Sequence, residues 1–353
     1  MDVDVKPTWS PPSTGVIPAS DREHLGTVLF GLWMTVGLFL DGYFHQNLDT
    51  DGESFLTPWH GVFYAGFTAS ALWLATMSRR RAGGAVDWRL TSLPAGYDGA
   101  RLGLLLFALG GLGDAGWHSA FGVERGIDAL LSPTHLLLFA GLVLILTAPL
   151  RAARATPDHA PGPWMLAGSV IAATALVGFF LNFAWGLGIA ALTRVAYDPV
   201  TDAGETAVIA GVASTLVTTA VLFTAARALL AAVTPPAAAF TLMFGTVALL
   251  VSSAFDEDAE GVAAAAVAGA MLDVLIRMKD ADRLRWPLPA CLGAAAATLW
   301  LVYLGLLSAL DGIEWPAEIW LGTVALNALA AFALGSVIAP PPDPTADLGR
   351  AAP

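Results

Sequence analysis

Residues 25 to 44 read LGTVLFGLWMTVGLFLDGYF, a stretch in which Asp41 is the first charged residue. An α-helix needs about 20 mainly apolar residues to cross the hydrocarbon core of a bilayer. Similar stretches recur along the chain, and we count ten of them: 25–44, 58–77, 101–117, 133–150, 163–185, 206–231, 237–255, 261–277, 287–310 and 316–338. The sequence therefore predicts an all-α, polytopic membrane protein with about ten transmembrane helices.

The composition agrees with a membrane location. The chain has 353 residues, of which 56% are hydrophobic and 13% are charged, and its mean hydropathy is +0.66. These values lie far from the balance of a soluble domain. The net charge of −12 favours cations, and not nucleic acid, as partners. The single Cys291 excludes a disulfide framework. We expect a multi-pass protein of the cell (plasma) membrane, surrounded by membrane lipid.

The basic residues predict the orientation, because cytoplasmic loops retain Lys and Arg. If the N-terminus lies inside, all but Arg125 and Arg194 of the 17 basic residues fall on the inner side. Both termini are therefore predicted to be cytoplasmic, and the ten helices to pair as five hairpins with short outer turns. The resulting segments are a tail at 1–24, two hairpins at 25–150, a six-helix scaffold at 151–338 and a second tail at 339–353.

The first two hairpins carry the same polar pattern, an internal repeat. Residues 41–61 read DGYFHQNLDTDGESFLTPWHG, and residues 114–136 read DAGWHSAFGVERGIDALLSPTHL. Each contains Asp-x-x-x-His, an acidic stretch, and then a hydroxyl residue, a proline, one further residue and a second histidine. The repeated residues are Asp41, His45 and His60 in the first copy, and Asp114, His118 and His135 in the second.

Helix geometry brings the members of each set together. An aspartate and a histidine four residues apart project from one face of a helix. The hydroxyl residue is a typical N-cap and proline suits the first helical position, so Thr57-Pro58 and Ser132-Pro133 each predict the start of the returning helix. The second histidine then lies in the first turn. Each hairpin is predicted to place one carboxylate and two imidazoles at the same depth, near the outer face.

This group of side chains is typical of a metal site. Ionisable groups within the membrane are unfavourable unless they have a partner, and a divalent metal is such a partner. Two neutral imidazoles and a carboxylate suit copper, zinc or iron and leave coordination positions open. Of the six histidines, only His24 and His159 lie outside the motif. The alternative is a network of Asp–His hydrogen bonds or a proton relay.

Four loop acids are candidates for a role around the metal ligands. They are Asp49, Glu53, Glu124 and Asp128. Such carboxylates can accept a hydrogen bond that orients a histidine ring, can guide cations towards the site, or can simply be solvated.

At Asp41-x3-His45 followed by Thr57-Pro58-Trp59-His60, the chain resembles the C subunit of the copper membrane monooxygenases, the particulate methane and ammonia monooxygenases. That family carries Asp-x3-His on one helix and Thr-Pro-Ser-His at the start of the next, and these residues bind copper within the membrane. The resemblance implies that Asp41, His45 and His60 are copper ligands.

The second copy, which ends in Ser132-Pro133-Thr134-His135, follows the same family pattern. The resemblance covers 41–61 and 114–136, and the chain departs from the family elsewhere. The family subunit has a neighbouring site built around an Asn and two His. Asn182 resembles that Asn, but Gly186 stands where a His would be.

Three functions are compatible with these features. The first is a copper-dependent, monooxygenase-like oxidoreductase that acts on an apolar substrate, with additional membrane subunits or a homo-oligomer as partners. The second is a metal or cation transporter, for which Asp273 is the only other acidic residue beyond the first turn of a predicted helix, since Glu318 lies in the first turn of 316–338. The third is a zinc-dependent intramembrane lipid hydrolase, with Glu53 or Asp128 as general base. The sequence favours the first.

Overall fold

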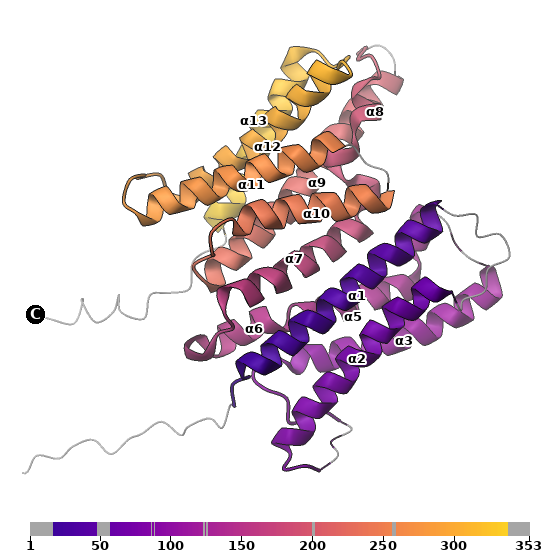
Figure 1. Cartoon of the computed structure of the whole chain (residues 1–353). Coiled ribbons are helices and arrows are strands. Elements are labelled where there is room, and N and C mark those ends of the chain that lie inside the picture. Colours follow the sequence, from indigo (N-terminus) through magenta and orange to yellow (C-terminus); the bar gives the residue numbers. More distant parts are fainter. Residues whose placement is uncertain are drawn as a thin grey trace, which may run out of the picture.

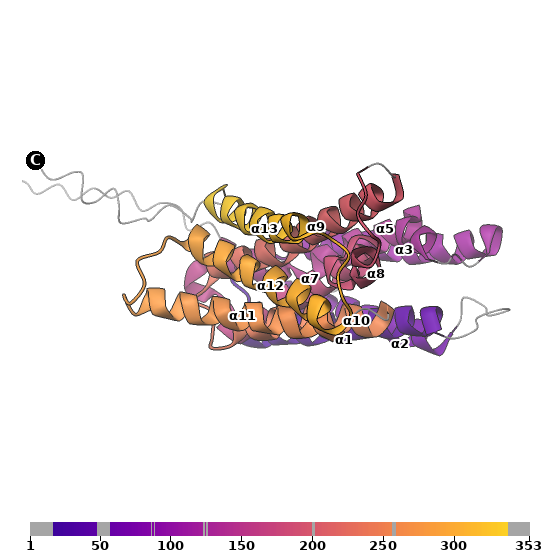
Figure 2. The same ribbon diagram turned by 90° about the horizontal axis from the view of Figure 1, so that it is seen from above.

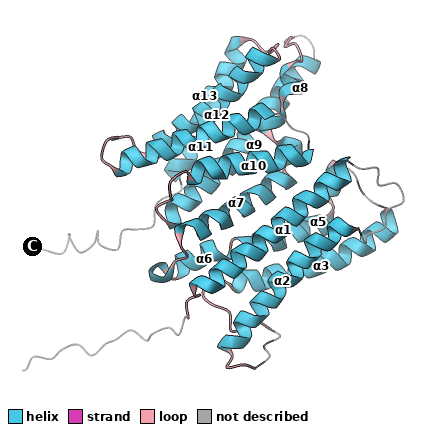
Figure 3. Ribbon diagram, viewed as in Figure 1, coloured by secondary structure: helices cyan, strands magenta, loops and turns pink. Residues whose placement is uncertain are grey.

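The computed structural model describes residues 17–47, 57–85, 87, 89–122, 124, 126–199, 202–255 and 259–337. Within these ranges the chain forms helices joined by loops, without a strand (Figures 1 and 3). The all-α prediction is therefore confirmed for the part of the chain that is described.

Each of the ten predicted stretches coincides with a helix. These helices are α1 (Asp21–Asn47), α2 (Pro58–Arg81), α3 (Asp98–Phe121), α5 (Pro133–Leu146), α7 (Pro163–Phe180), α9 (Asp202–Ala232), α10 (Ala239–Phe255), α11 (Ala259–Asp280), α12 (Leu288–Leu310) and α13 (Ala317–Val337). Shorter helices lie between them: α4 (Ile127–Leu131), α6 (Ala148–Ala155), α8 (Ala190–Thr193) and the 3-10 turns η1 (Pro157–His159), η2 (Asn182–Ala184) and η3 (Gly186–Gly188).

Six of the described helices are long and apolar enough to cross a membrane: α1, α7, α9, α11, α12 and α13. A seventh span exists if α5 and α6, which meet at an angle of 42°, cross together. These apolar helices support a multi-pass membrane protein. This observation supports six or seven spans, whereas the sequence predicts ten.

Two predicted helices end earlier than expected. The stretch 133–150 bends after Leu146, because Pro149 in the first turn of α6 has no N–H to continue the helix and its ring crowds the preceding turn. The stretch 163–185 stops at Phe180, so Asn182 lies in the turn η2 and not in a helix as predicted.

The irregular backbone after α7 is stabilised by other helices. Gly186 N–H donates to Thr218 Oγ1 at 2.7 Å, and Ile189 N–H donates to the Tyr303 hydroxyl at 3.2 Å. Non-helical backbone is tolerated at membrane depth only where such partners satisfy its polar groups. Hydrogen bonds from α9 and α12 therefore stabilise the break after α7.

The helices form two facing rows with α7 between them. Seen from above, α1, α2, α10 and α11 lie along one side, and α3, α5, α9 and α13 lie along the other (Figure 2). Helix α1 packs against α2, and α3 packs against α5, while α7 contacts α1, α5, α9 and α10. The two hairpins that carry the repeated motif are thus held next to each other on one flank of the bundle (Figure 1).

The far end of the first hairpin is closed by buried polar contacts. Arg81, the last residue of α2, donates hydrogen bonds to the carboxylate of Glu23 and to Pro18 O. His24 is fully buried and its Nδ1 lies 2.9 Å from the Tyr97 hydroxyl. Helix α1 starts at Asp21, so this histidine belongs to the helix and not to the predicted tail.

Candidate metal centre

The first set of motif residues comes together where α1 ends and α2 begins. His45 Nε2 lies 3.7 Å from Asp41 Oδ1, and His60 Nε2 lies 3.5 Å from Asp41 Oδ2. The two imidazole rings are 5.1 Å apart between centroids. We call Asp41, His45 and His60 the first triad.

The second set of motif residues repeats this geometry between α3 and α5. Both His118 Nε2 and His135 Nε2 approach Asp114 Oδ1, at 3.4 and 3.1 Å. Thr134 Oγ1 donates a hydrogen bond to the same oxygen at 3.1 Å. Asp114, His118 and His135 form the second triad, and its aspartate is more buried than that of the first, with side-chain exposed fractions of 2% and 13%.

Both returning helices begin as the sequence predicts. The Thr57 hydroxyl accepts a hydrogen bond from His60 N–H at 3.2 Å, and the Ser132 hydroxyl accepts one from His135 N–H at 3.4 Å. Each cap is followed by a proline at the start of its helix. The N-cap therefore fixes the backbone of the histidine that belongs to the triad.

Local partners also orient the imidazole rings. The Nδ1 atom of His60 lies 2.9 Å from Thr57 Oγ1, and that of His118 lies 3.1 Å from Gly122 O. His135 Nδ1 pairs with Ala129 O. Because a carbonyl oxygen only accepts hydrogen bonds, Nδ1 of His118 and His135 carries the proton, and Nε2 of each ring faces the aspartate.

The donor atoms fit a metal ion. In each triad one ligand atom per residue lies within 4.8 Å of the other two. Ligands about 2.0–2.2 Å from a tetrahedral ion are roughly 3–4 Å apart, as the Nε2–carboxylate distances are here. His135 Nε2 and Asp114 Oδ1 lie 3.1 Å apart and pair with each other, so a cation that binds both atoms would replace this contact. Asp41 Oδ1 is buried and has no hydrogen-bond partner among the described residues, so a cation there would satisfy it.

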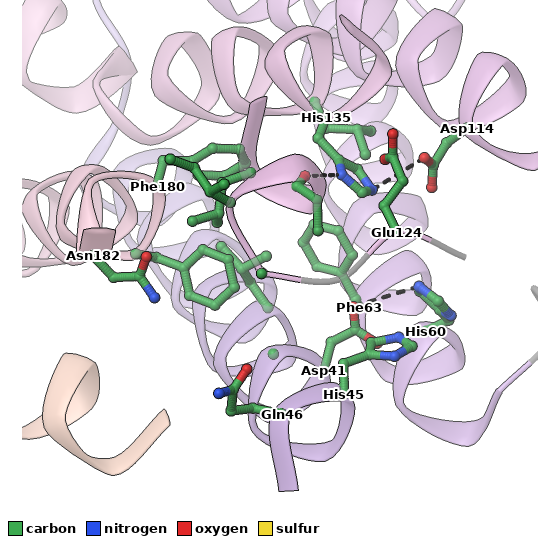
Figure 4. Close-up of a pocket in the computed structure, with 18 of the residues that line it drawn as sticks. Asp41, His45, Gln46, His60, Phe63, Asp114, Glu124, His135, Phe180 and Asn182 are labelled. Atoms are coloured by element: carbon green, nitrogen blue, oxygen red, sulfur yellow. Dashed lines mark hydrogen bonds and ion pairs between the residues drawn. The ribbon is translucent and has the colours of Figure 1, made fainter. Parts of the chain in front are cut away.

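Both triads open into one cavity of about 480 Å³. Asp41 is close enough to Asp114 and His135 to interact with them electrostatically. The rest of the wall is largely apolar, and Figure 4 shows Phe63 and Phe180 beside the polar groups. The lining residues outside the motif include Leu38, Leu138, Leu142, Phe179, Phe183 and Phe255. The fold therefore brings two candidate metal sites to one largely apolar chamber.

The loop acids behave differently from one another. Glu124 lines the cavity, and its Oε1 accepts a hydrogen bond from Trp117 Nε1 at 2.7 Å. Asp128 is exposed on α4 and is not part of the cavity wall, so the structure gives no support for its role as an orienting group or base. Asp49 and Glu53 lie outside the described residues.

Several cavity residues could not be assigned from the sequence. Tyr64 lies one turn after His60, with 6.2 Å between the ring centroids, and reaches Gly111 of α3. Aromatic residues are so common at membrane interfaces that their spacing carries no signal of a site. Asn182 and Gln46 face the cavity from the opposite side (Figure 4). The resemblance indicates Asn182, but nothing in the sequence indicates Gln46.

The chain matches no protein-family model, no curated protein and no solved structure.

Replacing Thr57 by alanine is expected to lower the free energy of unfolding by about 0.5–2 kcal/mol, because α2 loses its N-cap. It should also weaken metal binding at the first triad, because the His60 ring loses its Nδ1 partner. Denaturation in mixed micelles with sodium dodecyl sulfate and calorimetric titration with Zn²⁺ measure the two effects. Thr57→Ser keeps the hydroxyl and should behave as wild type, so equal behaviour of the two variants would contradict this role.

Proposed function

We propose that this protein is an integral membrane metalloprotein whose two triads bind copper and which oxidises an apolar substrate in the cavity between them. One observation carries the proposal: two Asp-His-His sets from separate hairpins line the same largely apolar cavity. Such a cavity has the composition of a small-molecule site, where a few polar groups are placed within an apolar wall.

The donor set is compatible with copper, and the resemblance favours copper over zinc and iron. Imidazole nitrogens suit copper, zinc and iron, and the motif offers no sulfur ligand. The resemblance of Asp41-x3-His45 and Thr57-Pro58-Trp59-His60 to the copper ligands of the membrane monooxygenases supports the same choice. Bound copper would supply one-electron redox chemistry with dioxygen.

The residues of this chain have separate tasks in such a reaction. The aspartates and histidines hold the metals, while Thr57 and the carbonyls of Gly122 and Ala129 fix the histidine rings. The phenylalanine and leucine side chains bind the apolar substrate and exclude water. In a monooxygenase reaction one atom of dioxygen enters a C–H bond and the other leaves as water, with two protons and two electrons from an external reductant.

We further propose the ten-span topology, with both termini cytoplasmic and the triads near the outer face. The support is the polarity of the helices that carry the motif. Helix α2 starts beside the first triad and ends with Arg79, Arg80 and Arg81. Arg151 and Arg154 lie on α6, beyond the end of α5 that is remote from the second triad. If the basic residues are retained inside, both triads lie on the outer side, in agreement with this topology.

The transporter alternative is less well supported, because Asp273 has a structural role. Its carboxylate accepts hydrogen bonds from Phe240 N–H and Thr241 N–H at 3.2 and 2.9 Å and from the Thr241 hydroxyl at 2.7 Å. It thus caps the start of α10. A carboxylate that accepts these three hydrogen bonds is poorly suited to bind a cation on its way inward.

The proposal is tested by elemental analysis of the purified full-length protein in detergent, after reconstitution with copper, zinc and iron in parallel. We expect one tightly bound copper ion per triad, retained through dialysis. Retention of zinc in preference to copper would replace oxidation by metal-assisted hydrolysis. Retention of none of the three metals would overturn the proposal and leave the triads as hydrogen-bonded networks.

A further inference from the structure

Glu124 is the cavity residue whose environment is hardest to explain without a ligand. It lies in the loop between α3 and α4 and lines the cavity together with Asp114, His118 and His135. In the view of Figure 4 its side chain overlaps those of His135 and Asp114, which line the same cavity. It is also close enough to His135 to interact with it electrostatically.

The carboxylate of Glu124 is anchored on one side only. Its Oε1 accepts the hydrogen bond from Trp117 Nε1, and the Trp117 ring packs on Phe121 with 4.6 Å between centroids. Its Oε2 is buried and has no hydrogen-bond partner among the residues that the structure describes. A buried carboxylate oxygen without a partner is unfavourable. Within the part of the chain that is described, the anchored side chain therefore presents one carboxylate oxygen without a partner to the cavity.

We propose that Glu124 matches the charge of the second triad to a divalent cation. This inference rests on the proposed metal binding. If Asp41 is assigned to the ion of the first triad, two neutral imidazoles and the carboxylates of Asp114 and Glu124 together carry two negative charges, which balance a 2+ ion. A monovalent ion would leave one negative charge at the cavity wall uncompensated, which is unfavourable where water is partly excluded.

Glu124 acts from outside the ligand set. The three residues whose donor atoms lie within 4.8 Å of one another are Asp114, His118 and His135, and Glu124 is not among them. It is thus a specificity-determining residue that acts on the ion electrostatically, without binding it. It can also accept a hydrogen bond from a polar molecule at the open side of the triad. Trp117, next to His118 on α3, positions it.

The test measures ion selectivity at the second triad alone. Full-length protein carrying His45→Ala, which disables the first triad, is titrated by calorimetry with Zn²⁺ as a redox-inert divalent probe and with Ag⁺ as a monovalent probe. Adding Glu124→Gln keeps the shape of the side chain and removes its charge. We expect Zn²⁺ affinity to fall by about 10- to 100-fold, the usual effect of losing an outer partner, and Ag⁺ affinity to fall much less.

Two further variants control for position and for charge. Trp117→Phe keeps the Glu124 charge but removes its anchor, so its Zn²⁺ affinity should fall between those of the parent and Glu124→Gln. Asp128→Asn removes an exposed charge from α4, which follows that loop, and should leave both affinities unchanged.

The outcomes separate this inference from the proposed function. If the His45→Ala parent binds no Zn²⁺, the metal site itself fails. If it binds Zn²⁺ and Glu124→Gln binds it equally well, the role of Glu124 is refuted while the site stands. An equal loss for Zn²⁺ and Ag⁺ would also refute charge matching, because it would show a general disturbance of the loop.

Discussion

Protein in which His45 and His118 are both replaced by alanine is expected to retain no metal, whereas the wild type retains one ion per triad. Each substitution removes one of the three ligands of its triad. The lost ligand is the imidazole Nε2 that faces Asp41 or Asp114. The loss of a ligand should exceed the about 10- to 100-fold effect that removal of an outer partner has on affinity. Elemental analysis after dialysis measures the retained metal.

The single variants show whether the triads act independently. His45→Ala should lose the ion of the first triad and keep that of the second, and His118→Ala should do the reverse. His159→Ala is the matched control, because His159 is exposed and lies on η1, outside the cavity. Full metal content in the double variant would show that other groups bind the ions. Loss of both ions in either single variant would show one shared centre in the cavity.

The positions of the helices could be predicted from the sequence because length and apolarity alone decide where a helix can lie in a bilayer. The ends of two helices could not. The break after Phe180 depends on the Thr218 and Tyr303 hydroxyls, which are distant in sequence and satisfy the backbone of 186–189. The bend before α6 had a local signal in Pro149, and its angle depends on packing.

The two triads could be predicted for a similar reason. The four-residue spacing and the hydroxyl-proline cap are local rules, and they bring Asp114, His118 and His135 together once α3 and α5 pair. The shared cavity depends on how two hairpins pack, which no local rule encodes. Glu124 and Asp128 were equivalent as loop acids in the sequence. They differ in the structure because the Trp117 indole holds Glu124 towards the triad, whereas Asp128 is exposed on α4.

Replacing Gly141 by alanine is expected to destabilise the protein and to weaken the second triad. A Cβ at Gly141 would lie 2.7 Å from Gly103 O and 2.8 Å from Phe107 N. The contact is reciprocal, since a Cβ at Gly103 would lie 2.6 Å from Gly141 O. These are backbone atoms that no rotamer change can move, so α3 and α5 must separate. Overpacking of this kind lowers stability by about 1–3 kcal/mol.

The consequence for the site follows from the geometry of the hairpin. Asp114 and His118 are on α3 and His135 is on α5, so separation of these helices pulls the donors of the second triad apart. Zn²⁺ affinity at the second triad should therefore fall, while the first triad, built from α1 and α2, keeps its affinity. Denaturation in mixed micelles and calorimetric titration measure the two effects.

Gly305→Ala is the matched control for the change in helix propensity. Gly305 is also in the middle of a helix, and a Cβ there would meet nothing within 4 Å. Alanine is favoured over glycine in helices by up to about 1 kcal/mol, so this variant should be as stable as wild type or slightly more so. The two substitutions are chemically identical and should change stability in opposite directions. If Gly141→Ala also leaves stability and Zn²⁺ affinity unchanged, the close crossing of α3 and α5 does not set the geometry of the second triad.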